Sequence, residues 1–427
     1  MRAWQYVLYA CGQLGMMCLA RFFFQWNLEY ARQPTDTSDH LLDPALFGLV
    51  LFGFRIFDGV TDPVAGVFSD RWVRRGRERR QILVFSFLVP IVGLLLIFSP
   101  HAGMSEAARW AVVAAGMLIF FIGYTIYGIP YWSLVADYAG DDHDVRRRLS
   151  NLLGAGILLA TAVVAIGSPA VVEARGYLEA ALWFGAPATL LMVLPYFAQP
   201  RRPAAAPVTD GLEPSLGDMF KTAFGDRRFL AVLVLFSGSQ MSFTVMTAGS
   251  AAIAVEVLGG SVSDVSRLLG PFLLAAIPFF VLVPMISRRA GWERAVVTAS
   301  LALGVVYAGT GFLGAEGERP FLMAGLLFAC AGPMAAVLLG IEGEAVTTCS
   351  RESPGELTAI YFSVLNLVVK AMNGLAVLLA GVLLKAGSFK LIGPSAGALL
   401  WVGVAGYFAL RPRAAAAGRP AAPPPAA

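Results

Sequence analysis

The chain has 427 residues, of which 57% are hydrophobic and only 14% are charged, and its mean hydropathy is +0.69. Soluble domains contain about 25% charged residues. The apolar excess is spread over the whole length, which argues against a soluble domain with one anchor and predicts an all-α membrane protein that crosses the bilayer many times. The net charge of +4 lies mostly in loops, so it indicates topology and not a nucleic-acid-binding surface.

Charged and Gly/Pro-rich breaks divide the chain into apolar segments, each long enough to cross about 30 Å of hydrocarbon. The segments are 3–29, 44–69, 81–98, 106–136, 149–171, 177–197, 228–256, 264–287, 294–313, 320–342, 356–384 and 393–410. We therefore expect twelve transmembrane helices.

Arginine alternates between the loops that connect these segments. The basic loops contain Arg71, Arg74, Arg75, Arg77, Arg79, Arg80, Arg146, Arg147, Arg148, Arg201, Arg202, Arg288 and Arg289. The intervening loops are acidic or poor in arginine and lysine. Because basic loops stay on the cytoplasmic side, the pattern predicts a multi-pass protein of the cell (inner) membrane with both termini cytoplasmic.

The chain divides at a proline- and arginine-rich loop. We expect a six-helix bundle over 1–198, a cytoplasmic central loop over 199–227, a second six-helix bundle over 228–410 and a disordered Ala/Pro-rich tail over 411–427. Gly66-Val-Phe-Ser-Asp70-Arg71 follows the second segment, and Pro284-Met-Ile-Ser-Arg288-Arg289 takes the same place in the second half. Two six-helix halves with a site between them is the major facilitator layout.

The most informative feature is a group of charges inside the second apolar segment. Residues three and four apart share a helix face, so Arg55, Asp58 and Asp62 form one patch. A charge at membrane depth costs about 2.5–3.5 kcal/mol on insertion scales. Paired carboxylates that hold a small cation or a proton would justify this cost. The other interpretation is a structural salt-bridge network with Arg55.

Four stretches carry a family resemblance: Arg55-x-x-Asp58-x-x-Thr61-Asp62-Pro63-x-x-Gly66, Tyr124-Thr125-Ile-Tyr-Gly128-Ile-Pro130-Tyr131-Trp132, Asp141-Asp-His-Asp144-Val-Arg146 and Ser363-Val-Leu-Asn-Leu-Val-Val-Lys370. Together they resemble the glycoside–pentoside–hexuronide:cation symporters, the melibiose permease family. The resemblance covers residues 5–410. Its motifs point to the family and not to one substrate.

The resemblance implies a cation site lined by Asp58, Thr61, Asp62 and Thr125, approached from the other half by Lys370. Carboxylate and hydroxyl oxygens suit a hard cation such as Na⁺. A proton is an equal alternative, because two nearby carboxylates favour protonation of one of them. Arg55 and Lys370 would neutralise the site when no cation is bound. A charge pair between the halves would also suit a conformational switch.

The resemblance is weaker where sugars bind. Sugar-transporting members have acidic residues where this chain has Gly128 and Met17, and an arginine where it has Leu153. Trp132 is kept at the position that stacks on the sugar ring. These departures put a melibiose-like substrate in doubt.

Other residues are therefore expected to contact the substrate. Arg21, Gln13 and Gln25 on the first helix are polar, and Arg21 suits a uronate, sulfonate or phosphate. Two other interpretations of Arg21 remain open: an interfacial side chain, or a salt bridge with Glu29 or Asp58. The apolar walls would also suit an amphiphile; they are expected to consist of Tyr131, Trp132, Phe22, Phe23 and Phe24.

Other polar residues are expected to have structural or gating roles. Asp70, Arg71 and Arg77 are predicted to form a cytoplasmic charge latch between spans. Glu342 is a candidate for a gate at the cytoplasmic end of the tenth segment. Gln240 and Asn373 either face the cavity or make helix-packing hydrogen bonds.

The sequence predicts a cation-coupled secondary transporter that works by alternating access. The cargo is a small solute: a sugar, a glycoside or an anionic sugar derivative. The alternatives are transport of a lysolipid or another amphiphile and, less favoured, a receptor that transports nothing. The sequence has no HExxH or GxSxG motif, which argues against an enzyme. We expect no cofactor beyond Na⁺ or H⁺, no nucleic-acid partner, and a monomer in contact with the lipid bilayer, its solute and a monovalent cation.

Overall fold

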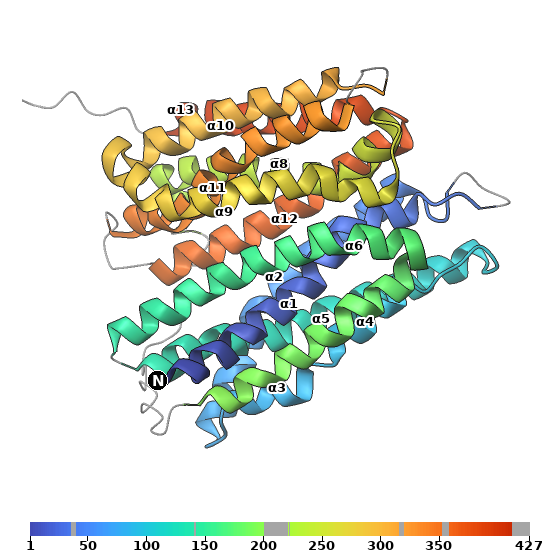
Figure 1. The fold of residues 1–427 in the computed structure, drawn as a ribbon. Helices are drawn as coiled ribbons and strands as arrows, with labels where there is room; N and C mark the ends of the chain where they lie inside the picture. Colours follow the sequence, from blue (N-terminus) through green and yellow to red (C-terminus); the bar gives the residue numbers. More distant parts are fainter. Residues whose placement is uncertain are drawn as a thin grey trace, which may run out of the picture.

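The computed structural model describes residues 1–35, 40–140, 142–199, 221, 223–315, 320–351 and 358–411. These residues form long helices that run side by side (Figure 1). Most of the predicted central loop and nearly all of the predicted tail lie outside the described residues. The fold is the expected all-α membrane architecture.

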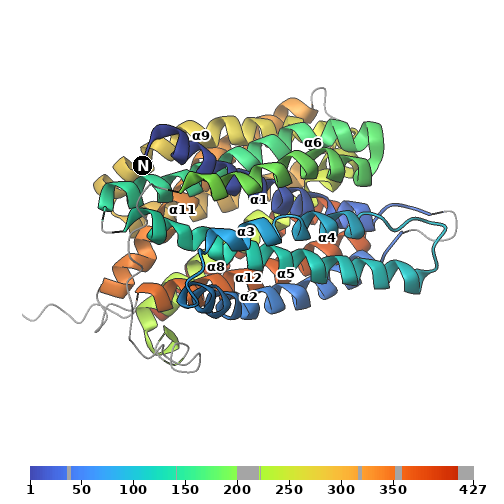
Figure 2. The ribbon, with the colours of Figure 1, turned by 90° about the horizontal axis from the view of Figure 1, so that it is seen from below.

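The first half contains α1 to α6. Their bounds are α1 Ala3–Ala31, α2 Pro44–Arg74, α3 Arg80–Ser86, α4 Val89–Ile97, α5 Glu106–Ala139 and α6 His143–Val193, followed by the 3₁₀ turn η1 Leu194–Ala198. The short helices α3 and α4 together make one crossing of 18 residues, 80–97, and Pro90 lies where the second of them starts. Figure 2 shows α1 beside α6, against which it packs closely.

The second half contains α8 to α13. Their bounds are α8 Arg227–Ala252, continued by the π-turn η2 Ile253–Val257; η3 Val262–Asp264 with α9 Val265–Ala290; α10 Trp292–Gly309 with η4 Thr310–Phe312; α11 Pro320–Arg351; α12 Thr358–Lys385; and η5 Phe389–Leu391 with α13 Ile392–Leu410.

Eleven continuous helical stretches among the described residues are long and apolar enough to cross a membrane, one fewer than the twelve spans expected. The difference lies in α6, whose 51 residues are broken at Gly176, where φ is 80° and ψ is 173°. Glycine adopts this backbone conformation without steric cost. The chain turns back at Gly176, so α6 appears as two antiparallel green limbs (Figure 1). These limbs are the expected fifth and sixth spans.

Both termini lie at one end of the molecule. Gln5 Nε2, near the N-terminus, donates a hydrogen bond of 2.7 Å to the carbonyl of Gln199. Arg411, just after α13, pairs with Glu293 in the first turn of α10. The basic residues Arg71–Arg80, Arg146–Arg148, Arg288 and Arg289 also lie at this end, which we call the arginine-rich end. The other end of the helices is called the opposite end.

The two halves of the chain form two bundles, coloured blue to green and yellow to red in Figure 1. They meet mainly through α2 and α12, with further contacts between α6 and α9 and between α1 and α8. Glycines permit the close approach of α2 and α12. A Cβ on Gly48 would lie 2.6 Å from Leu378 Cα, and a Cβ on Gly381 would lie 2.2 Å from the carbonyl oxygen of Pro44.

Replacing Gly381 by alanine should therefore strain the interface between the bundles. The new methyl group would clash with backbone atoms, which cannot rotate away. We therefore expect overpacking to lower the free energy of unfolding by about 1–3 kcal/mol. The measurement is the apparent melting temperature of the purified protein. Gly53→Ala on the exposed side of α2 is the control, because no atom lies within 4 Å of its added Cβ and alanine favours a helix. Equal melting temperatures for the two variants would contradict the expected clash.

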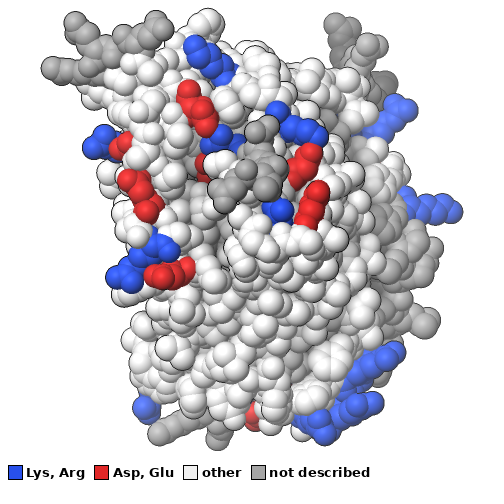
Figure 3. Space-filling view, turned by 90° about the vertical axis from the view of Figure 1, so that its right-hand side faces the viewer, with Lys and Arg blue, Asp and Glu red and all other residues white. Residues whose placement is uncertain are grey.

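At the opposite end, polar contacts join the two bundles. Arg32 Nη1 lies 2.5 Å from Glu256 Oε1, and the backbone N–H of Ser263 donates a hydrogen bond of 2.6 Å to Glu173. Lys385 at the end of α12 pairs with Asp43, which caps α2. Figure 3 shows this end, with acidic and basic side chains beside one another.

The packing of α2 on α12 continues to the middle of both helices. A Cβ on Gly59 would lie 2.4 Å from Leu367 Cδ1, and Asp62 pairs with Lys370 of α12. Among the described residues, the ion pairs between the bundles thus lie at the opposite end and at Lys370.

Candidate cation site and central cavity

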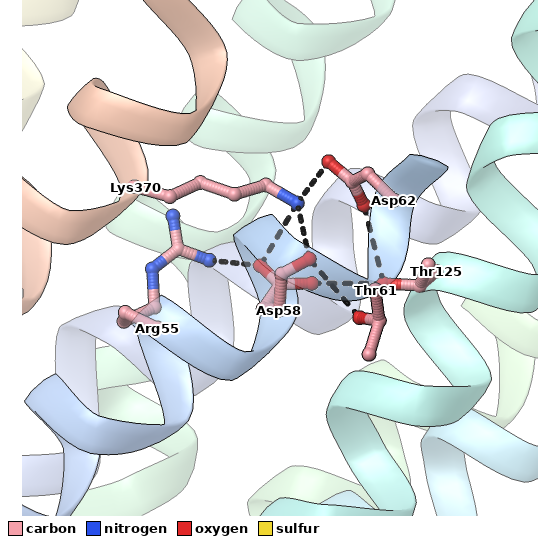
Figure 4. Close-up of polar contacts among 6 residues, drawn as sticks. All are labelled: Arg55, Asp58, Thr61, Asp62, Thr125 and Lys370. Atoms are coloured by element: carbon pink, nitrogen blue, oxygen red, sulfur yellow. Dashed lines mark hydrogen bonds and ion pairs between the residues drawn. The ribbon is translucent and has the colours of Figure 1, made fainter. Parts of the chain in front are cut away.

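The charged patch lies near the middle of α2. This 31-residue helix begins at Pro44, and the side chain of Asp43 caps it by accepting hydrogen bonds from the backbone N–H groups of residues 45 and 46. Arg55, Asp58 and Asp62 follow at spacings of three and four, so they share a face. That face points toward α5 and α12 (Figure 4).

Lys370 of α12 reaches both carboxylates of α2 (Figure 4). Its Nζ lies 2.6 Å from Asp62 Oδ2 and 3.1 Å from Asp58 Oδ2. Arg55 Nη1 lies 2.7 Å from the same Asp58 oxygen. Two acids and two bases give the group a net charge of zero. One ammonium group from the second bundle thus lies between two carboxylates of the first.

Two threonines lie beside the carboxylates in different ways. Thr125 Oγ1 on α5 donates a hydrogen bond of 2.8 Å to Asp58 Oδ1 and lies 3.4 Å from Asp62 Oδ1. Thr61 Oγ1 instead donates to the backbone carbonyl of Asp58 at 3.1 Å. Thr125 therefore connects the two carboxylates directly, whereas Thr61 bonds to the backbone of its own helix.

Burial differs across the group. The Asp58 side chain is fully buried, whereas the side chains of Asp62 and Lys370 are 20% and 12% exposed. The Arg55 guanidinium is enclosed by the rings of Phe24 and Phe121, whose centroids lie 5.1 and 5.8 Å away. An ion from solution would therefore reach the site past Asp62.

The oxygens of this region come from the carboxylates and a threonine. Pro63 has no N–H, so it cannot donate the usual helical hydrogen bond to the carbonyl of Gly59, four residues earlier. The region holds four carboxylate oxygens and the Thr125 hydroxyl. Hard cations bind such oxygen sets, and a single proton can also be shared between paired carboxylates.

A cavity of about 300 Å³ lies between the bundles, next to the charged group. Its charged lining residues are Arg21, Arg55 and Lys370, and its polar ones include Gln240, Thr244 and Asn373. Thr244 Oγ1 donates a hydrogen bond of 2.9 Å to Asn373 Oδ1, so α8 and α12 are linked in the cavity wall.

The structure separates the residues expected to contact substrate. Arg21 and Trp132 line the cavity. Gln13 lies behind Trp132 and accepts a 3.0 Å hydrogen bond from its indole N–H. Tyr131 is fully buried and donates its hydroxyl to the carbonyl of Tyr9 at 2.7 Å. Gln13 therefore positions the tryptophan, and Tyr131 belongs to the packing core instead of the cavity wall.

Gln25 and Gly128 are also buried and do not line the cavity. A Cβ on Gly128 would lie 3.2 Å from Met16 Sδ, so this glycine permits close packing of α5 on α1. Of the three expected phenylalanines, Phe24 lines the cavity, whereas Phe22 and Phe23 are fully buried in the core.

Sequence reasoning missed the wall that the second bundle supplies. Its aromatic members are Phe243, Phe272, Phe280, Tyr307 and Phe328. A phenylalanine in an apolar helix gives no sign of whether it faces lipid, core or cavity. Nearby, Gln240 Nε2 donates a 3.0 Å hydrogen bond to Glu342 Oε2, which ties the predicted gate residue to the cavity wall.

The predicted charge latch has a different basic partner. Asp70 pairs with Arg79 at 2.6 Å, and Arg79 also lies 3.0 Å from Asp137 of α5. Arg77 instead stacks over Trp72 at 4.4 Å from its centroid, and Arg71 is exposed. The prediction that Arg71 and Arg77 supply the positive charge of the latch was therefore wrong. Arg79 supplies it, because this residue lies where the chain returns toward α2 and α5.

Comparisons with known proteins agree with this architecture. The solved structures that resemble the chain include a bacterial homologue of the human lysosomal transporter Spinster in an inward-facing, unoccupied conformation. It is 16% identical, with a TM-score of 0.67, over 95% of this chain and 97% of that one. The nucleoside transporter NupG is 14% identical, with a TM-score of 0.65, over 95% and 98%. Identities this low show the fold alone.

A peptide transporter solved in complex with sulfate, POT, is similar as well, at 12% identity and a TM-score of 0.66 over 95% of this chain and 93% of that one. No curated protein sequence matches the chain. The family model for MFS/sugar transport proteins, in contrast, matches residues 6–401, nearly the whole chain. The chain therefore belongs to the MFS/sugar transport protein family, as its melibiose permease-like motifs predicted, and is a membrane transporter and not an enzyme.

Proposed function

We propose that this transporter is a symporter that couples a small solute to Na⁺ or H⁺ at Asp58 and Asp62. The observation that carries the proposal is the position of Lys370, whose ammonium group contacts both carboxylates across the bundle interface. A monovalent cation and the ammonium carry the same charge and compete for the same oxygens. Binding of one therefore displaces the other.

This competition couples the ion to the conformation. Without a coupling cation, the pairs of Lys370 with Asp58 and Asp62 bind the bundles to each other near the middle of the membrane. With a cation bound, the cation neutralises the carboxylates in place of Lys370, and the bundles change conformation around the bound solute. The Lys370 contact neutralises the empty site, so the transporter can change conformation without two uncompensated carboxylates at membrane depth.

The cavity limits the size of the solute. A 150 Å³ apolar cavity holds benzene, so the 300 Å³ seen here suits a molecule of about twelve non-hydrogen atoms, the size of a monosaccharide. A lysolipid would place only part of its length inside. The apolar majority of the lining nevertheless favours an amphiphile as the second candidate. A receptor that transports nothing would have no use for competition between Lys370 and a cation.

Reconstituted protein in liposomes tests the coupling. We expect an inward gradient of Na⁺, or of H⁺, to raise the initial uptake of radiolabelled hexoses or hexuronates about tenfold over liposomes without a gradient. Imposing each gradient separately identifies the ion. Uptake that responds to the solute gradient alone, with no effect of either cation, would contradict symport.

A further inference from the structure

Arg21 is a basic residue that the cation site does not use. It lies within α1, ten residues before the helix ends at Ala31, or about 15 Å along the axis. Met17, Ala20 and Phe24 share its side of the helix, and all of them line the central cavity with it. Arg21 thus faces the space between the bundles.

The two acids that could pair with Arg21 are engaged elsewhere. Glu29 Oε1 lies 2.8 Å from Arg32 Nη2, and Asp58 pairs with Arg55 and Lys370. In the part of the chain that the structure describes, the Arg21 guanidinium has no hydrogen bond and no ion pair. A guanidinium held without a partner at membrane depth is costly, and an anion beside it removes that cost.

The charge of the cavity has one sign. Among the described residues, no Asp or Glu lines it, whereas Arg21, Arg55 and Lys370 do. Asp58 and Asp62 offset the charges of Arg55 and Lys370 from behind the wall. Glu342 also lies behind the wall, where it accepts a hydrogen bond from Gln240. Arg21 is therefore the charged lining residue that no carboxylate of the described residues contacts.

The remaining wall is largely apolar. Phe24 and Phe120 come from the first bundle, and Phe243, Phe272 and Phe328 from the second. Burial of an aromatic ring, an alkyl chain or the apolar face of a sugar ring against such a surface is favourable in free energy. They offer few groups for a ligand that is polar on every side.

We propose that the transported solute is a small organic anion with one apolar face, whose carboxylate, sulfonate or phosphate is bound by Arg21. The guanidinium offers two parallel N–H donors, which match the oxygens of such a group. This inference names the substrate class of the proposed symporter and so rests on that function. Aromatic acids and acidic sugars share the required chemistry.

Binding to the purified full-length protein tests the inference without any gradient. Two matched pairs of compounds distinguish an aromatic acid from an acidic sugar as the ligand. They are 3-phenylpropionate with 3-phenylpropanol, and D-glucuronate with D-glucose. In the wild type, we expect the anion of at least one pair to bind about 10- to 100-fold more tightly than its neutral partner at pH 7. Arg21→Gln should remove this preference, and Arg21→Lys should retain part of it.

Arg175→Gln is the matched control, because Arg175 is 53% exposed and pairs with Glu179 at the surface. It should leave the preference intact. Absence of anion binding at millimolar concentration would overturn the proposal. So would equal binding of both members of each pair, or a preference that survives in Arg21→Gln. Because no cation gradient enters the measurement, failure of symport at Asp58 and Asp62 would leave a positive result standing.

Discussion

Asp62→Asn is expected to abolish cation-driven uptake while the protein still folds. The amide has the shape of the carboxylate but no charge, so the site loses its more exposed anion, which is 2.6 Å from Lys370. Hydrogen bonds to charged groups contribute about 1.5–3 kcal/mol each, so we expect a weakening of cation binding by about 10- to 100-fold. The measurement is the thermal stabilisation of the purified protein by Na⁺ and by stepped pH, followed by gradient-driven uptake.

Asp62 is a better target than Asp58. Asp58 is fully buried against Arg55, and removing one partner of a buried ion pair costs about 3–5 kcal/mol of stability. Loss of transport in an Asp58 variant would therefore not distinguish misfolding from loss of the ion site.

The control for Asp62→Asn is Asp144→Asn. Asp144 pairs with Arg147, but its side chain is 74% exposed, and surface pairs contribute little. It should keep the cation response of the wild type. If Asp62→Asn also keeps that response, the charged group on α2 is a structural salt-bridge network, and coupling must be sought elsewhere.

Lys370→Gln is expected to separate cation binding from turnover. Without the tethered ammonium, a cation no longer has to displace a competitor from Asp58 and Asp62, so its apparent affinity should rise about tenfold or more, a change of about 1.4 kcal/mol. The cation-free transporter then has two carboxylates and only Arg55 to neutralise them. We expect exchange of labelled solute across the liposome membrane to persist and net uptake to fall, because only net uptake requires the empty transporter to change conformation.

Lys390→Gln provides the comparison, because Lys390 is an exposed lysine on η5, away from the charged group. Its cation affinity and net uptake should match those of the wild type. A Lys370→Gln protein with unchanged or weaker cation affinity would mean that the ammonium and the cation do not compete. The proposed link between ion binding and conformational change would then fail.

The sequence alone determined the membrane architecture and the charged patch. Helical spacing places Arg55, Asp58 and Asp62 on one face whatever the neighbouring helices do, because the spacing depends only on the geometry of one helix. The same holds for the twelve apolar segments, whose lengths are fixed by the thickness of the bilayer. Lys370 was linked to the patch through family resemblance, since nothing local to α12 indicates which helix of the first bundle it faces.

The tertiary structure decided which polar and aromatic residues reach the cavity. Trp132 and Tyr131 are neighbours in an aromatic stretch of α5, yet one lines the cavity and the other is fully buried against α1. Likewise, only the return of the chain after α2 makes Arg79, and not Arg71 or Arg77, the partner of Asp70. Each of these outcomes depends on contacts between segments far apart in the sequence. An apolar helix has the same local pattern whether it faces lipid, another helix or a cavity, so its sequence does not reveal which of them it meets.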